Sequence, residues 1–207
     1  MMRHDFLDSL FPPRYDFYGM LTKQAELTAQ GTSQFVTWLK DPSPQNFNDF
    51  QRLADDVDMV RMRLEEQLIE AFTTPFDRED IYIFSVRMDR ILESVKAALL
   101  SVQAYSVAVD GAIIDMAANL AAGTAELAKG TALLAGEPQK AGAVIDAMRK
   151  SYTATQNAYR ESLAAIFKGN DAMEALKLTE VYHAIREAST AFDLVVDVFH
   201  RIIVRLI

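Results

Sequence analysis

The sequence predicts an all-α protein built from six long helices. Apolar residues recur at alternating intervals of three and four positions through most of the 207 residues, which places them on one face of a helix. No segment shows the strict alternation of apolar and polar residues that a half-buried strand needs. Clusters of Pro and Gly interrupt the apolar pattern, but none is long enough to act as a domain linker. We therefore predict a single helical domain over residues 1–207.

Three of the predicted helices occupy the first half of the chain. Prolines separate the first two, because proline cannot continue a helix and disfavours helical backbone at the residue before it. The expected ranges are 16–39 for the first helix, from after Pro44 to about Phe72 for the second, and from the turn near Asp77 to about Asp110 for the third.

The other three predicted helices fill the second half, over residues 113–134, 145–166 and 181–206. Gly123 and Gly130 lie on the apolar seam of the first of these. Because glycine weakens a helix by roughly 1 kcal/mol, we expect a neighbouring backbone to approach closely at these two positions. The last helix keeps its alternation of four and three without interruption, which is typical of helix-on-helix packing.

The turn between the second and third predicted helices is rich in acids. Pro75 biases Thr74 away from helical backbone, so the second helix ends before the turn. Asp77 can cap the third helix, with Thr74 as an alternative cap one turn earlier. A short turn of this kind makes the two helices antiparallel neighbours.

Acidic residues on both of these helices can meet across the predicted pair. Asp89 and Glu93 are four residues apart, so both carboxylates project from one face of the third helix. Asp58 and Asp55 on the second helix are within reach of that pair in an antiparallel arrangement. The sequence therefore predicts a cluster of carboxylates between the two helices.

These residues resemble the PhoU-like family of phosphate transport regulators. The specific signature is the turn Thr74-Pro75-Phe76-Asp77-Arg78-Glu79-Asp80-Ile81, with Asp58 sixteen residues before Thr74 and the pair Asp89 and Glu93 after it. A weaker likeness lies in Leu10-Phe11-Pro12 and the aromatics that follow, Tyr15, Phe17 and Tyr18. The resemblance covers most of the chain. It implies a PhoU-like bundle of two pseudo-symmetric three-helix halves.

The resemblance also implies a metal site at Asp58, Asp89 and Glu93. Family members place acidic pairs at inward helix positions, and such carboxylates suit divalent or iron-type cations. This sequence has Ala54 at the fourth position of the set. Asp55 is adjacent, but one residue rotates a side chain by about 100° around a helix, so it is a weak substitute.

The second half departs further from the family pattern. The register set by Tyr159-Arg160 places uncharged or basic residues where acids are expected: Tyr152, Gln156, Arg186 and Thr190. For the first half, the alternative to a metal site is an exposed acidic face neutralised by Arg61, Arg87 or Arg90.

Composition narrows the classes of partner. The net charge of −8 disfavours nucleic acid and anionic lipid, because both require a basic face. No cysteine is present, so no disulfide or thiolate metal site is predicted. Acids interrupt the first residues, and no export signal is predicted. The longest uncharged apolar-rich run lies between Lys96 and Asp110 and is shorter than the roughly 20 residues of a membrane span.

The resemblance implies a non-enzymatic regulatory or accessory protein of inorganic phosphate transport. Its partner would be a membrane phosphate transporter of the Pit type or the regulators of one, and its place the cytoplasm, peripheral to the inner membrane. Long apolar seams predict a homo-oligomer. The alternative is a generic helical oligomeric interaction protein with a degenerate metal site. A metal-dependent enzyme ranks third, because the sequence has no phosphate-cradling glycine loop, nucleophile elbow or Cys-His pair.

Overall fold

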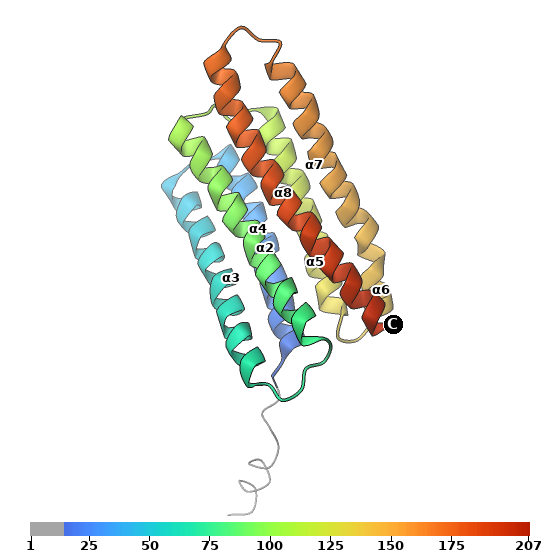
Figure 1. The fold of residues 1–207 in the computed structure, drawn as a ribbon. Helices are drawn as coiled ribbons and strands as arrows, with labels where there is room; N and C mark the ends of the chain where they lie inside the picture. The colour runs from blue at the N-terminus through green and yellow to red at the C-terminus, as the bar shows by residue number, and fades with distance from the viewer. Residues whose placement is uncertain (1–14) are drawn as a thin grey trace, which may run out of the picture.

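Six long helices account for most of residues 15–207, which are the residues that the computed structural model describes (Figure 1). They are α2 (Phe17–Lys40), α3 (Pro44–Glu70), α4 (Arg78–Tyr105), α5 (Gly111–Leu133), α7 (Ile145–Ile166) and α8 (Ala172–Leu206). A short α6 (Pro138–Ala141) and a 3-10 turn, η1 (Gly142–Val144), connect α5 to α7. No strand occurs in this part of the chain. The prediction of an all-α fold with six long helices is confirmed.

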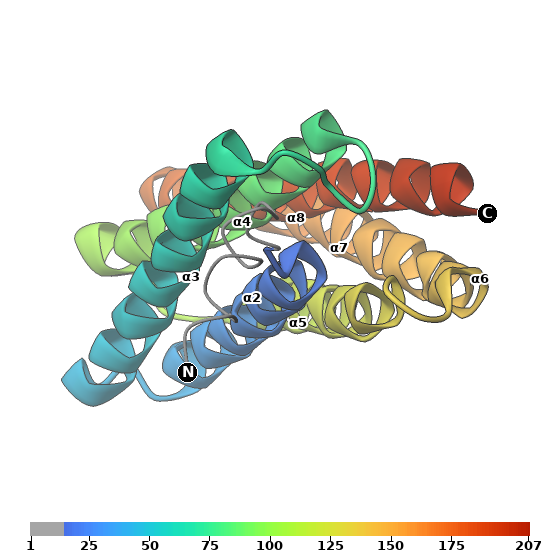
Figure 2. The ribbon, with the colours of Figure 1, turned by 90° about the horizontal axis from the view of Figure 1, so that it is seen from below.

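The helices form two halves whose contacts correspond one to one. In the first half α2, α3 and α4 pack on one another, and in the second half α5, α7 and α8 do the same. The halves meet where α2 packs on α5 and α4 packs on α8 (Figures 1 and 2). Each contact therefore has a counterpart when α2, α3 and α4 are matched to α5, α7 and α8. This correspondence agrees with the predicted pseudo-symmetric arrangement.

Side-chain caps fix the start of five of the six long helices. A carboxylate or hydroxyl at the position before each helix accepts a hydrogen bond from a backbone N–H of the first turn, which would otherwise have no partner. The capping residues are Asp16, Ser43, Asp77, Asp110 and Asp171. The expected Asp77 cap is thus present, whereas the hydroxyl of Thr74 donates to the carbonyl of Phe76 within the turn.

Several helix boundaries differ from the predicted positions, most of all the start of α8, which lies at Ala172, nine residues before the expected position 181. α4 ends at Tyr105, not near Asp110, because Ser106 adopts a left-handed backbone conformation with φ 52° and terminates the helix. Asp110 instead caps the next helix, where its Oδ1 lies 2.8 Å from the N of Ile113. α3 ends at Glu70, two residues before the expected Phe72.

The seam of α5 is closed by aromatic side chains. A Cβ on Gly123 would lie 2.7 Å from the ring of Phe192, and a Cβ on Gly130 would lie 2.6 Å from the ring of Phe199. Both rings belong to the buried stripe of α8. The predicted close approach is present, but its nature was wrong: side chains, not a backbone, occupy the space that the glycines leave. They are the two rings of α8, with Ser151 beside Gly123 and Val144 beside Gly130.

Three further features of the sequence can be compared with the described residues. Leu10-Phe11-Pro12 falls outside the described residues. Trp38 is buried at the end of α2. Among the helices of residues 15–207, none combines the length and hydropathy that crossing a bilayer requires.

Candidate functional site

Arg61 is the centre of the cluster that forms between α3 and α4. Its guanidinium donates to Asp58 one turn before it, at 2.5 Å, and to Glu65 one turn after it, at 2.7 Å. Across the helix pair, its Nε lies 3.2 Å from Oδ2 of Asp89 on α4. One cation therefore serves three carboxylates from two helices.

The three residues predicted as metal ligands all face the same hollow. Asp58, Asp89 and Glu93 line an open cavity of about 360 Å³ together with Arg61 and Lys96. Ala54, Asp55 and Leu92 complete the lining. Asp58 and Asp89 are joined through Arg61, whereas Glu93 pairs with Arg90 on its own helix at 2.7 Å. The predicted meeting of acids across the helix pair is present.

The charge balance of this cluster perturbs two groups. Burial raises the pKa of Asp89 to about 6; Arg61 opposes this shift, while Glu93 and Asp58 add to it. Burial lowers the pKa of Arg61, but hydrogen bonds to Asp58 and Glu65 outweigh that effect and leave its pKa above the usual range. Arg61 therefore stays charged, whereas Asp89, with its pKa raised to about 6, takes up a proton at mildly acidic pH.

This arrangement does not fit a metal centre. Within residues 15–207, no three carboxylate or imidazole groups are arranged so that they could hold an ion together. The guanidinium of Arg61 lies where a cation would have to contact both Asp58 and Asp89. Metal binding at Asp58, Asp89 and Glu93 stays a prediction, and it requires Arg61 to move away from these carboxylates.

The equivalent place in the second half has different chemistry. Matching Asp58 to Gln156 places Arg61 opposite Tyr159 on α7; on the third helix, a spacing shorter by one residue matches Asp89 to Arg186 on α8. The guanidinium carbon of Arg186 lies 4.9 Å from the centre of the Tyr159 ring, a cation–π contact. Each half thus joins its second and third helices at this level, by an ion pair in one half and a cation–π pair in the other.

Asp80 is a buried acid whose role the sequence reasoning missed. Its side chain is only 2% exposed, and it binds two arginines of α8, Arg201 at 2.7 Å and Arg205 at 2.6 Å. These ion pairs join the first turn of α4 to the last turns of α8. A signal was present in the sequence, because Asp80 lies four residues before Phe84 and hence in register with the apolar stripe of α4.

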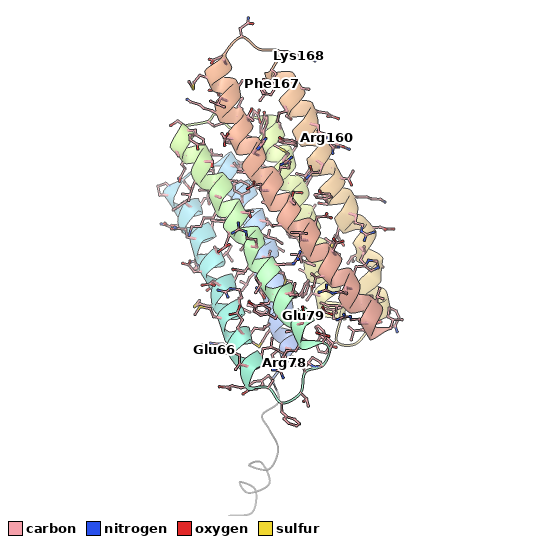
Figure 3. All side chains as sticks on the ribbon, viewed as in Figure 1. Glu66, Arg78, Glu79, Arg160, Phe167 and Lys168 are labelled. Atoms are coloured by element: carbon pink, nitrogen blue, oxygen red, sulfur yellow. The ribbon has the colours of Figure 1, made fainter. Side chains whose placement is uncertain are left out.

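An open groove lies at the end of the bundle where α3 turns into α4. Figure 3 shows Arg78 and Glu79 at this end, with Glu66 on the adjoining part of α3. The groove, which we call the turn groove, has a volume of about 940 Å³. It is lined by Glu65, Leu68, Ile69, Thr74, Phe76, Asp77, Arg78, Glu79 and Tyr82. Ile69 is 83% exposed, and Phe72 in the turn is 80% exposed.

Comparisons with known proteins identify the fold. No family model matches the sequence, and no curated protein matches it. Two crystal structures from Shewanella oneidensis match the structure closely. The first, a PhoU-like protein, has a TM-score of 0.72 and 14% identity, and the match covers 92% of this chain and 99% of that chain.

The second neighbour's description proposes a PhoU-like phosphate regulatory role for that protein. It has a TM-score of 0.70 and 14% identity, and the match again covers 92% of this chain and 99% of that chain. At 14% identity, this likeness shows a shared fold and nothing further. The chain has the six-helix fold of these PhoU-like proteins.

Proposed function

We propose that this chain is a non-enzymatic regulatory protein of inorganic phosphate transport. The observation that carries the proposal is the match of its six-helix fold, over nearly the full length of both chains, to PhoU-like proteins, one of which is described with a phosphate regulatory role. The signature turn around Asp77 adds support, because it forms the ordered connection between α3 and α4, the two helices that carry the acidic cluster. The role is regulatory and exerted through contacts between proteins.

The proposed partner is a membrane phosphate transporter of the Pit type, or a regulator of one, met at the cytoplasmic face of the inner membrane. Cytoplasmic loops of membrane proteins carry an excess of Lys and Arg. A chain with a net charge of −8 complements such loops. The face formed by α3 and α4 is the proposed contact, since Asp58, Glu65 and Asp89 gather there around Arg61 and Glu93 lines the same hollow.

Co-purification with the transporter tests this proposal. The full chain should retain a Pit-type transporter from the same genome that has been solubilised in detergent. Deleting the gene that encodes this chain should change phosphate uptake by cells. Glu93→Lys reverses a charge on the proposed face and should weaken retention, more at low salt than at high salt. Glu161→Lys is the matched control, because Glu161 is exposed on α7 in the other half. Equal retention of both variants, or no transporter retained by the wild type, would contradict the proposal.

The second candidate is a helical oligomeric interaction protein with a degenerate metal site. The ion pairs of Arg61 with Asp58 and Asp89 favour it, because the guanidinium already offsets the repulsion between the acids. Light scattering should then give an oligomer, and elemental analysis of the purified protein should find no stoichiometric metal. A metal-loaded protein whose melting temperature falls with chelator would refute this candidate.

A further inference from the structure

The outer side of α3 carries a line of exposed apolar side chains. Met59 is 59% exposed, Met62 is 50% exposed and Ile69 is 83% exposed. Their spacing of three and seven residues places all three along one side of the helix. Phe72 follows three residues beyond Ile69, in the turn, and is also exposed. We call Met59, Met62 and Ile69 the outer stripe.

The outer stripe is a property of α3 and not of edge helices in general. α3 packs on α2 and α4 and lies at one edge of the bundle, with α7 at the other edge (Figure 1). α7 is its counterpart in the second half, yet no large apolar side chain of Ile145–Ile166 is exposed. Clustered apolar exposure marks a surface that binds another molecule.

Two hollows adjoin the ends of the outer stripe. At one end, a hollow of about 280 Å³ between α2 and α3 is lined in part by Leu27, Met59 and Val60. At the other end, Ile69 lines the turn groove. Met59 and Ile69 are ten residues apart, which corresponds to about 15 Å along the axis, or roughly three turns of a second helix. A helix laid along α3 therefore reaches both hollows at once.

The net charge of α3 sets it apart from the other helices. Pro44–Glu70 contains seven acids and three arginines, which gives a net charge of −4. The other five long helices have net charges between −1 and +1. This count includes the arginines that pair with acids of the same helix, such as Arg61 with Asp58 and Glu65. α3 thus remains acidic after its own ion pairs are taken into account.

Two of the acids lie within the line of the outer stripe. Asp55 precedes Met59 by four residues, and Glu66 lies between Met62 and Ile69 at spacings of four and three. Neither forms an ion pair with a cation of residues 15–207. Lys23 of α2 lines the hollow beside Met59, and counting it changes the net charge of this surface only from −4 to −3.

This charge decides between the possible occupants. Two copies joined through their α3 helices would bring one charge of −4 against another, and like charges across an interface are unfavourable. An anionic lipid surface is disfavoured for the same reason. A helix with an apolar face and basic margins complements both the apolar side chains and the acids. Methionine side chains are flexible and adapt to the shape of such a helix.

We propose that the outer stripe binds a basic amphipathic helix of another protein. The apolar face of that helix covers Met59, Met62 and Ile69, and its Lys or Arg side chains lie opposite Asp55 and Glu66. The inference goes beyond the proposed transport role, because it names a chemical class of binding segment and holds for any protein that carries one. A defined peptide tests it, so its outcome is separate from whether a transporter is retained.

Methionine methyl NMR of the full chain locates the contact. The probe is a synthetic helical peptide of about 18 residues, about 27 Å long, with leucine on one face and lysine on the other. It should shift the methyl signals of Met59 and Met62. Met173 is the matched reporter, because it is exposed but lies at the start of α8, at the opposite end of the bundle from the α3–α4 turn (Figure 1). An equal shift at Met173, or no shift at any of the three, would overturn the proposal.

Variants of exposed apolar residues measure what the outer stripe contributes to affinity. Met62→Gln with Ile69→Gln removes two apolar side chains without changing the charge, and it should weaken peptide binding about tenfold in fluorescence anisotropy. Met173→Gln with Leu176→Gln is the matched control, since these residues are similarly exposed, and it should bind as the wild type does. Circular dichroism checks that both proteins remain folded. Equal affinities of the two double variants would show that charge alone attracts the peptide and would overturn the proposal.

The charge requirement is tested separately. Glu66→Gln should weaken peptide binding more at low salt than at high salt, whereas Glu187→Gln, which alters an exposed acid of α8, should have less effect. A peptide with glutamate in place of lysine should bind about tenfold more weakly. Equal binding of the acidic peptide would overturn the proposal. Self-association of the full chain that Met62→Gln with Ile69→Gln abolishes would also overturn it, by assigning the outer stripe to a second copy.

Discussion

Replacing Asp80 with Asn should destabilise the fold through the junction between the two halves. Asp80 is 2% exposed and binds Arg201 at 2.7 Å and Arg205 at 2.6 Å. The arginine side chains are 44% and 51% exposed, so water can replace part of what they lose. Asparagine keeps the shape of the side chain but removes the charge from both contacts.

The magnitude follows from this mixture of burial and exposure. Breaking a fully buried ion pair by removing one partner costs about 3–5 kcal/mol, because the other charge is left uncompensated. Rehydration of the two half-exposed arginines lowers this figure, and we expect a loss of about 2–3 kcal/mol in the free energy of unfolding. For a chain of this size, that loss corresponds to a fall in melting temperature of about 4–12 °C.

Urea unfolding followed by circular dichroism measures the change. Glu79→Gln is the matched control, because Glu79 is the neighbouring acid in the first turn of α4 and is exposed. It removes the same favourable interaction with the helix dipole without removing a buried ion pair, so it should cost about 0.3–1 kcal/mol. If Asp80→Asn is no more costly than Glu79→Gln, the junction through Arg201 and Arg205 does not stabilise the fold as argued.

Three further predictions concern the α5 seam and the acidic cluster. Gly123→Ala and Gly130→Ala should each lower the free energy of unfolding by about 1–2 kcal/mol, because overpacking against buried rings outweighs the gain in helix propensity; Gly136→Ala, with open space around it, should be near neutral in the same urea titration. Since burial raises the pKa of Asp89 to about 6 in the folded state, against about 4 in the unfolded chain, the folded state binds the proton more readily. The contribution of this group to stability should thus increase by about 2 kcal/mol from pH 7 to pH 4.5, and Asp89→Asn should lose that increase; parallel stability curves for both proteins would contradict it. Because Arg61 pairs with Asp58 and Asp89, Mn²⁺ at about 1 mM should leave the melting temperature of the wild type unchanged. A melting temperature that rises with Mn²⁺, and rises further in Arg61→Gln, would show instead that a cation competes with the guanidinium.

The six long helices could be predicted from the sequence because the interactions that form each helix are local. The three-and-four spacing of apolar residues, proline at helix starts and aspartate at caps each act over a few positions, and the six long helices followed from them. Errors arose where a single backbone conformation decides the boundary. Ser106 ends α4 by adopting a left-handed backbone conformation, and a serine side chain gives no reason to predict that conformation.

The partners of the functional residues depended on tertiary structure. The sequence placed Asp58, Asp89 and Glu93 near one another, yet only packing of α3 on α4 puts Arg61 between the first two. Glycines on α5 indicated a close approach, but the identity of the neighbour, rings from α8, depends on how the halves meet. Asp80 and Arg201 are more than a hundred residues apart, and no local pattern joins them. The sequence by itself determined which helices form and which faces are apolar, since these follow from neighbouring residues; tertiary structure decided which charges neutralise one another, because that depends on distances in space between residues far apart in the chain.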